Sequence, residues 1–309
     1  MTALKIRSAP RRIKGIGPME KRQKGICLVI LSGVVFGLNP FFAKQVYANG
    51  GNAWMLTFFS KAVGAAALLG MGRLSREAPV PLDRRRYGQL LICSLGAAAA
   101  PILLYSSYHS ISSGMATTLH FCYPALVLLG CAVFWRERLT RRQVVCCGLC
   151  MAGILCFYHP AGDSSPAGIL LALISGAAYA FYVAYLSKSG LQELPSYQLA
   201  GWLCLLTALE TLAASAAAGQ IDLVLTPAGW AFALAFSVLN SCVATIAFQI
   251  GARYVGPQSA SLLSTFEPLT SVLVGTVFFR EPFSPRDCGG MICILLSVVL
   301  LARPEKHNT

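Results

Sequence analysis

The chain has 309 residues, of which 56% are hydrophobic and 12% are charged. Soluble domains carry about 25% charged residues. Ten stretches of roughly 17–23 residues contain almost no Asp, Glu, Lys or Arg, and each is long enough to cross a bilayer core of about 30 Å as a helix. This pattern excludes a soluble enzyme, a nucleic-acid-binding module and a disordered chain. The net charge of +13 does not indicate a nucleic-acid partner, because most basic residues lie in short loops and in the N-terminal tail.

The fold class that we predict is an all-α integral membrane protein with ten transmembrane helices. In chain order, the predicted helices span residues 25–44, 53–72, 88–108, 114–135, 142–159, 166–187, 197–218, 228–250, 258–279 and 287–303. Short connections separate them. Thr140 can cap the fifth helix, and Ser284 with Pro285 can supply the cap and first turn of the tenth.

The basic residues favour one orientation in the membrane. With the N-terminus placed in the cytoplasm, 21 of the 25 Lys and Arg residues fall on the cytoplasmic side, three fall outside, and Lys61 lies within a helix. By the positive-inside rule, this split predicts that both termini are cytoplasmic. We therefore expect a multi-pass protein of the bacterial cytoplasmic membrane.

A shift of 144 residues overlays the chain on itself without a gap, with nine identities between positions 116 and 142. The pairs that composition explains least are Pro124 with Pro268, Arg136 with Arg280, Glu137 with Glu281 and, earlier in the chain, Lys44 with Lys188. Each copy holds five helices, so the second copy enters the membrane from the opposite side. Inverted repeats of this kind recur in secondary transporters. We predict a basic cytoplasmic tail over 1–24, a first repeat over 25–159, a second repeat over 166–303 and a cytoplasmic tail over 304–309.

Two segments carry a family resemblance: YPALVLLGCAVFWRERLTRRQVVCCG at 123–148 and EPLTSVLVGTVFFREPFSPRDCGG at 267–290. Each has a Pro early in one helix, a Glu at its end and a Gly in the next helix. On these motifs the chain resembles the EamA-type transporters of the drug/metabolite transporter superfamily. The resemblance implies a transporter but no particular substrate, because family members carry amino acids, sugars, nucleotides and drugs. Lys61 stands where the family often has Arg, and Lys lacks the planar fork of Arg.

Three charged residues lie inside predicted helices: Lys61, Glu210 and Glu267. A charge at the bilayer centre costs about 2.5–3.5 kcal/mol on insertion scales, so each should face protein or a water-filled cavity. Glu267 is the first candidate for binding a proton, because the following Pro268 frees backbone at a depth where this is tolerated beside a cavity. The alternative is a structural ion pair between Glu267 and Lys61. Lys61 could equally bind a substrate carboxylate, and Glu210 is expected to be structural or to lie at the lipid interface.

Other polar residues at mid-depth complete the predicted substrate and proton pathway. By the repeat, Tyr123 corresponds to Glu267, so the two should face one cavity from opposite halves. His120 could relay protons, since imidazole titrates near neutral pH, or it could simply be hydrogen-bonded. The remaining members of the pathway are Asn39, Asn240, Tyr105 and Tyr179, with Tyr108 and Tyr182 as weaker candidates. Asn240 could instead join helices, and the tyrosines could belong to interfacial belts.

Helix breaks are expected at Pro40, Pro124 and Pro268. His109 and His159 lie near helix ends and are expected at the membrane interface. The Cys147-x-x-Cys150 spacing lies inside a membrane helix without a second pair, so it does not indicate a metal or redox site.

Together these features predict a secondary transporter that moves a small organic metabolite, an amino acid-like compound or a drug, by alternating access. Export and proton coupling through Glu267 are hypotheses. The alternatives are a membrane-embedded enzyme acting on a lipid and a passive channel. No enzyme activity, cofactor, metal or nucleic-acid partner is expected; the expected partners are the substrate and the lipid bilayer, and a homodimer is left open.

Overall fold

A computed structural model describes residues 18–74, 79–134, 136, 139–156, 165–220, 224–256, 260 and 263–302. Every regular element within these ranges is helical. The elements of the first half are α1 (Pro18–Gly37), α2 (Asn39–Ala48), α3 (Ala53–Leu74), α4 (Arg84–Ser107), α5 (Ser113–His120), α6 (Tyr123–Phe134) and α7 (Arg141–Cys156). Those of the second half are α8 (Pro166–Lys188), η1 (Leu191–Glu193), α9 (Ser196–Ala217), α10 (Pro227–Ser237), the π-helix η2 (Val238–Ala244), α11 (Thr245–Val255), α13 (Phe266–Phe279) and α14 (Pro285–Ala302).

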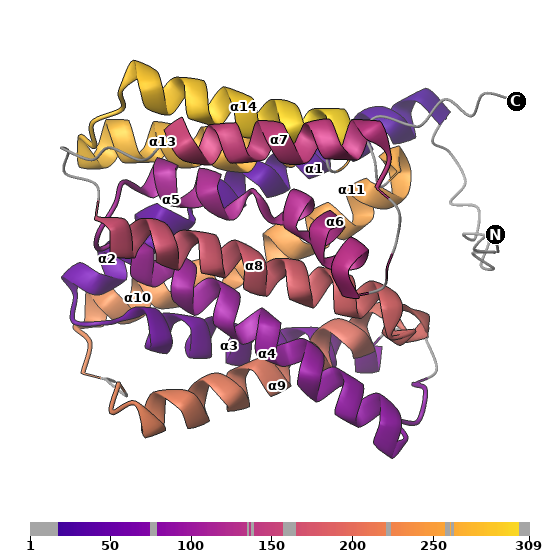
Figure 1. Ribbon diagram of the computed structural model, residues 1–309. Helices are drawn as coiled ribbons and strands as arrows, with labels where there is room; N and C mark the ends of the chain where they lie inside the picture. The colour runs from indigo at the N-terminus through magenta and orange to yellow at the C-terminus, as the bar shows by residue number, and fades with distance from the viewer. Residues whose placement is uncertain are drawn as a thin grey trace, which may run out of the picture.

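Within the described ranges, seven helical segments are long and apolar enough to cross a membrane, so the chain is a multi-pass membrane protein. They are Met19–Ala48, Ala53–Leu74, Arg84–Ser107, Ser113–Phe134, Pro166–Lys188, Ser196–Ala217 and Pro227–Val255. Three shorter helices, α7, α13 and α14, have 16, 14 and 18 residues and run beside the long ones (Figure 1). A total of ten crossings stays a prediction, and the predicted end of the fifth helix at 159 lies outside the described residues.

The packing pairs each half of the chain with the other. Helix α1 packs on α11 and α4 packs on α8, while α3 packs on α9 and α7 packs on α14. In the repeat, α1 corresponds to α8, and α4 corresponds to α10 and α11. The pair α1–α11 is therefore the repeat equivalent of the pair α8–α4. In the pairs α3–α9 and α7–α14, each helix packs on its own repeat equivalent. Two halves related by a pseudo-twofold axis give this pattern, so the predicted repeat fits the structure.

Several predicted helices are interrupted rather than continuous. The predicted helix over 25–44 starts earlier, at Pro18, and is divided into α1 and α2 at Leu38, directly before Asn39 and Pro40. The predicted helix over 114–135 is divided into α5 and α6 by a turn at 121–122, directly before Tyr123 and Pro124. Because proline has no N–H to donate, it fits the first turn of the new helix at each break.

Two further predicted helices have irregular turns. The helix predicted over 228–250 is present as one continuous helical segment, Pro227–Val255, whose middle turns form the π-helix η2 between α10 and α11. Thr245 Oγ1 donates to the carbonyl of Asn240 at 3.0 Å and satisfies an acceptor in the π-helical turns. In the segment predicted over 258–279, α13 begins at Phe266, so Pro268 lies in its first turn. The predicted caps are confirmed: Thr140 Oγ1 accepts from the N–H of Gln143, and Ser284 Oγ accepts from the N–H of Asp287.

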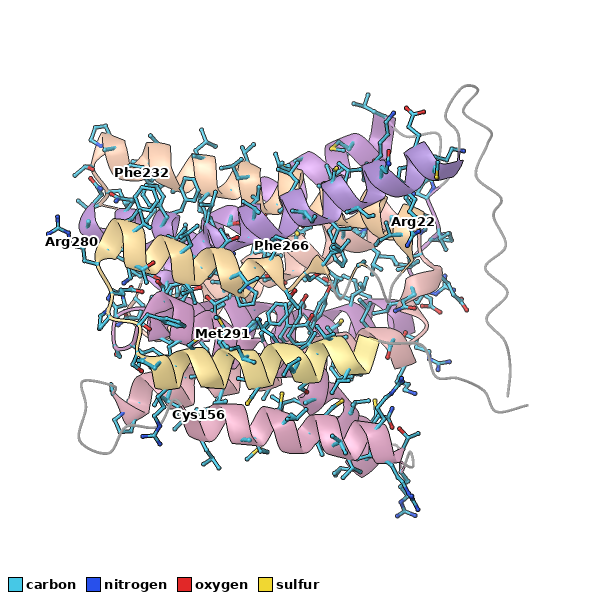
Figure 2. The ribbon with its side chains drawn as sticks, turned by 90° about the horizontal axis from the view of Figure 1, so that it is seen from above. Arg22, Cys156, Phe232, Phe266, Arg280 and Met291 are labelled. Atoms are coloured by element: carbon cyan, nitrogen blue, oxygen red, sulfur yellow. The ribbon has the colours of Figure 1, made fainter. Side chains whose placement is uncertain are left out.

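The helix ends gather at two opposite ends of the bundle, which are named here by two repeat-related lysines. At the Lys44 end, α2 and α13 stop and α5 begins; at the Lys188 end, α8 stops and α1 and α9 begin (Figure 1). Figure 2 shows Arg280 at the Lys44 end and Arg22 at the Lys188 end. The two ends of the bundle are therefore the two sides over which the Lys and Arg residues were counted in the sequence.

Candidate functional site: a cavity between the two halves

A cavity of about 430 Å³ lies in the middle of the bundle, between the two halves of the chain. Its wall includes all eight residues predicted for the substrate and proton pathway, which are Asn39, Lys61, Tyr105, His120, Tyr123, Tyr179, Asn240 and Glu267. Tyr182 also lines it. The sequence analysis selected these residues because they are polar at mid-depth, and polar groups at that depth are placed against protein or a cavity.

The helix breaks explain why so many polar groups meet there. The break before α2 brings Asn39 to the cavity, and the break between α5 and α6 brings His120 and Tyr123. The turn before α13 brings Ser264 and Glu267. Interrupted helices free backbone groups at mid-depth, and these are tolerated where they line a cavity. The three predicted prolines thus position the site from the helix starts, without lining the cavity themselves.

Glu267 lies among aromatic rings. Tyr105, Tyr123 and Tyr179 are close enough to interact electrostatically with its carboxylate. The rings of Tyr123 and Tyr179 are 4.7 Å apart in an edge-to-face arrangement. In the described part of the chain, the carboxylate of Glu267 has no hydrogen bond or ion pair. Its carboxyl group is therefore available to a group that enters the cavity.

The predicted alternative of a structural ion pair between Lys61 and Glu267 is wrong for this conformation. Among the described residues, neither side chain forms an ion pair. Lys61 lies beside Cys204 on the α9 side of the cavity, whereas Glu267 belongs to α13. Both line the same space without forming an ion pair, so the cavity wall carries one basic and one acidic side chain at separate places.

The two asparagines join the halves at the cavity. Asn240 Nδ2 donates to Asn39 Oδ1 at 2.8 Å, which links η2 to the start of α2 across 201 residues of sequence. The joining role considered for Asn240 is thus present together with cavity lining. Nearby, the hydroxyls of Ser60 and Ser241 lie 3.2 Å apart, between α3 and η2.

His120 is held from one side. Its Nδ1 lies 2.8 Å from Ser175 Oγ, and its ring lies 5.4 Å from that of Tyr179. Helix α8 approaches closely here because Gly176 has no side chain; a Cβ at this position would lie 2.9 Å from the carbonyl oxygen of His120. His120 is therefore hydrogen-bonded, as one of the two interpretations predicted, and it also lies in the cavity wall. Its role as a proton relay stays a prediction.

Other candidates lie outside the cavity wall. Glu210 Oε1 accepts from Ser94 Oγ at 2.7 Å, between α9 and α4, as a structural role requires. The hydroxyl of Tyr108 lies 3.3 Å from Thr117 Oγ1, and His109 stacks on Tyr47 at the Lys44 end with 4.3 Å between ring centroids. His159 lies outside the described residues. No group of three or more His, Cys, Asp or Glu in the described ranges is arranged to hold a metal ion.

Several residues that line the cavity were not predicted from the sequence. The polar ones are Ser32, Cys204, Thr207, Ser241, Thr245, Gln249 and Ser264. One signal could have identified Gln249, because the 144-residue shift places it on Tyr105. The small hydroxyl residues gave no such signal, since Ser and Thr are common in membrane helices as packing residues.

The cavity continues toward the Lys188 end. A second space of about 260 Å³ shares Tyr182, Ala200, Leu203 and Gln249 with the cavity wall. We call this space the vestibule. It reaches Gln192 and Ser196, where η1 and α9 begin. The cavity therefore has an approach from the end of the bundle at which α8 stops.

Comparison with known proteins decides the family. The sequence profile of the EamA-like transporter family matches residues 23–158 and again residues 166–303. The chain belongs to the EamA-like transporter family. Its two matched segments place the cavity of this EamA-like transporter between them, with Glu267 contributed by the second and Lys61 by the first.

Relatives of this EamA-like transporter carry transporter names without a substrate. It is 22% identical to the uncharacterized transporter YxxF of Bacillus subtilis, over 94% of this chain and 93% of YxxF. It is 23% identical to the uncharacterized inner membrane transporter YicL of Salmonella typhimurium, over 94% of this chain and 99% of YicL. A match to the uncharacterized transporter YwfM of Bacillus subtilis is 30% identical but spans 46% of this chain and 48% of YwfM.

One solved crystal structure is similar in fold. It superposes with a TM-score of 0.61 at 16% identity, covering 90% of this chain and 96% of that chain. At this identity the likeness concerns the fold alone. The family and the names of the relatives indicate a transporter.

Proposed function

We propose that this protein is a secondary transporter that moves a small organic metabolite across the bacterial cytoplasmic membrane by alternating access. The observation that carries the proposal is the central cavity, which both halves line and whose wall carries one basic and one acidic side chain that do not pair with each other. Inverted repeats place substrate sites near the membrane midplane between the halves. Charged residues at that depth mark substrate or ion pathways in membrane proteins.

The chemistry of the wall favours a substrate with an amine and an acid group. The ammonium of Lys61 suits a carboxylate, and the carboxylate of Glu267 suits an ammonium group. The tyrosines around Glu267 add ring faces that attract a cation. A cavity of about 430 Å³ falls within the size range of small-molecule sites, about 300–1,000 Å³. An amino acid-like compound fits this combination.

Export by proton exchange follows from the same residues. The vestibule gives the substrate an approach from the Lys188 end, which the positive-inside rule assigns to the cytoplasm. Glu267 can hold either the substrate ammonium or a proton, so a proton that arrives from the other side would displace the substrate. This competition would couple outward movement of the substrate to inward movement of a proton.

The test compares metabolites inside and outside cells that express the wild type, Glu267→Gln or Glu210→Gln. Glu210→Gln is the matched control, because it removes the charge of a carboxyl within a membrane helix that does not line the cavity. We expect a chemically unchanged compound to accumulate outside with the wild type and the control, and about tenfold less with Glu267→Gln, because a charge-assisted contact is lost.

Two other outcomes would overturn the transport proposal, and a third would overturn the role of Glu267. A new product instead of a relocated compound would indicate a membrane-embedded enzyme. Equilibration without accumulation against a gradient would indicate a channel. Equal transport and equal pH dependence in well-expressed wild type and Glu267→Gln would remove Glu267 from the mechanism.

A further inference from the structure

A polar contact at the Lys44 end joins three helix ends from both halves of the chain. Lys44, near the end of α2, forms an ion pair with Glu281, which lies just after α13. The other carboxylate oxygen of Glu281 accepts from the N–H of Ser113 at 2.8 Å and from its hydroxyl at 2.7 Å. Ser113 is the first residue of α5, so Glu281 holds α13 to α5 and α2 at the same time.

This contact is partly withdrawn from solvent, which distinguishes it from the surface ion pairs of the protein. The side chains of Lys44 and Glu281 are 23% and 11% exposed, whereas those of Lys24 and Glu20 are 51% and 54% exposed. An ion pair on the surface contributes little, but a withdrawn pair with added hydrogen bonds is costly to break. The carboxylate of Glu281 also lies at the positive end of a helix dipole.

A tight backbone turn at the end of α13 positions the carboxylate of Glu281. Arg280 adopts a left-handed conformation, with φ at 52°, and ends α13. The turn directs the N–H of Glu281 to the carbonyl of Gly275 at 3.1 Å and brings its carboxylate against the Gly275 backbone. A Cβ at Gly275 would collide with Glu281 Oε2 and would lie 2.8 Å from Ser113 Oγ, so a larger residue would require the carboxylate to move away from its present position. Arg136, the repeat equivalent of Arg280, has the same conformation with φ at 55°.

The contact lies between the cavity and the Lys44 end of the bundle. On α2, Lys44 follows the cavity-lining Asn39 by about 7 Å along the helix axis. Two further hydrogen bonds join α5 to α13. Thr117 Oγ1 lies 2.8 Å from Ser271 Oγ, and Ser271 Oγ donates to the carbonyl of Ser113 at 3.1 Å. The vestibule lies on the opposite side of the cavity.

We propose that Lys44, Glu281 and Ser113 form a latch that closes the cavity at the Lys44 end, and that release of this latch opens the cavity there. The inference rests on the proposed transport function, since a gate has meaning only for a transporter. The latch names the residues that keep the cavity closed at the Lys44 end while the substrate approaches from the Lys188 end. Lys44 and Glu281 come from different halves of the chain, so a movement that separates α2 from α13 breaks their contact.

Hydrogen exchange measured by mass spectrometry tests the latch without a substrate. The protein in lipid nanodiscs would be compared as wild type, Glu281→Gln and Lys44→Gln. We expect amides of residues 108–118 and 43–50 to exchange about tenfold faster in both variants, because a charge-assisted network has been removed. Amides at the Lys188 end, in residues 189–199, should exchange at the wild-type rate or more slowly. The double variant should match the single variants, because the two residues act as one unit.

Two matched variants complete the design. Glu137→Gln makes the same change at the repeat-equivalent position in the sequence, and Glu20→Gln breaks the exposed pair with Lys24. Neither should accelerate exchange at the Lys44 end. Wild-type exchange at that end in both latch variants would overturn the proposal, and so would faster exchange at both ends, since that indicates general destabilisation. These results are independent of Glu267, so the latch and the transport proposal can fail separately.

Discussion

The two ends of the bundle differ in what lies between them and the cavity. At the Lys44 end, a carboxylate from the second half bonds to an ammonium and to two donors of a helix start in the first half. At the Lys188 end, the halves are also hydrogen-bonded, as Gln198 is to the backbone of Val80, but the vestibule adjoins the cavity there. The closed end is held by the bonds of one carboxylate, whereas the width of the passage at the open end depends on the side chains that line the vestibule. Different substitutions should therefore affect each end.

The largest effect is expected from Gly275→Ala. The added methyl group would displace the carboxylate of Glu281 and break its bonds to Ser113. We expect a loss of about 2 kcal/mol in unfolding free energy, because hydrogen bonds to a charged group are lost. Thermal unfolding in detergent measures it, together with exchange at the Lys44 end. The control is Gly130→Ala on α6, where a Cβ meets no atom within 4 Å. A destabilisation of the same size in both variants would contradict the special role of Gly275.

The next effect concerns the open end. Ala200 lines both the cavity and the vestibule, so Ala200→Phe should fill the passage between them. Transport from the cytoplasmic side should fall about tenfold, since overpacking costs about 1–3 kcal/mol, while exchange at the Lys44 end stays unchanged. Proteoliposome efflux of the substrate found in the metabolite comparison measures this. Ala213→Phe places the same ring on an exposed position of α9 and should leave transport intact. Normal transport by Ala200→Phe would show that the substrate takes another route.

The smallest effect is a pH dependence at the closed end. Burial, and then the charge of Lys44, lower the pKa of His109 below its ordinary value of 6.5, so this conformation favours the neutral ring. The closed end should be fully stable above pH 6.5 and should weaken as pH falls below 6.5 and through the lowered pKa, because a second positive charge then forms beside Lys44.

The measurement is the unfolding temperature of the wild type and His109→Gln at pH 7.5 and 5.5. The decrease between the two pH values should be smaller in the variant, which cannot be protonated there. His109 stacks on Tyr47, so the variant also loses a ring contact, but that loss is the same at both pH values. An equal decrease in the two proteins would assign the pH dependence to other groups.

The sequence was most informative where the free-energy cost of a residue does not depend on how the helices pack. A charge within twenty apolar residues is expensive wherever it lies, so Lys61, Glu210 and Glu267 could be identified without any knowledge of packing. The prolines likewise predicted the breaks before α2 and α6, because the missing N–H is a property of the residue. The π-helical turns at Asn240 have no proline and were not predicted.

The roles of the polar pairs could not be predicted in the same way. The repeat placed Lys44 and Glu281 among the residues shared by the two halves, but it did not show that they contact each other. The same analysis allowed Lys61 to pair with Glu267, and the described structure contains no such pair. Whether Lys44 contacts Glu281, and whether Lys61 contacts Glu267, depends on which side of each helix faces its neighbour. Successive side chains point about 100° apart around a helix, so a small rotation of a helix changes its contacts.

By itself, then, the sequence determined that the chain is a membrane protein, that it consists of two related halves and that a few charged groups lie within the membrane. These properties follow from composition and order along the chain. The tertiary structure decided that Asn39 meets Asn240, that Glu281 meets Lys44 and Ser113, and that the cavity continues toward the Lys188 end. Contacts across 201 and 237 residues of sequence depend on how whole helices pack, because no local preference of the chain encodes their partners.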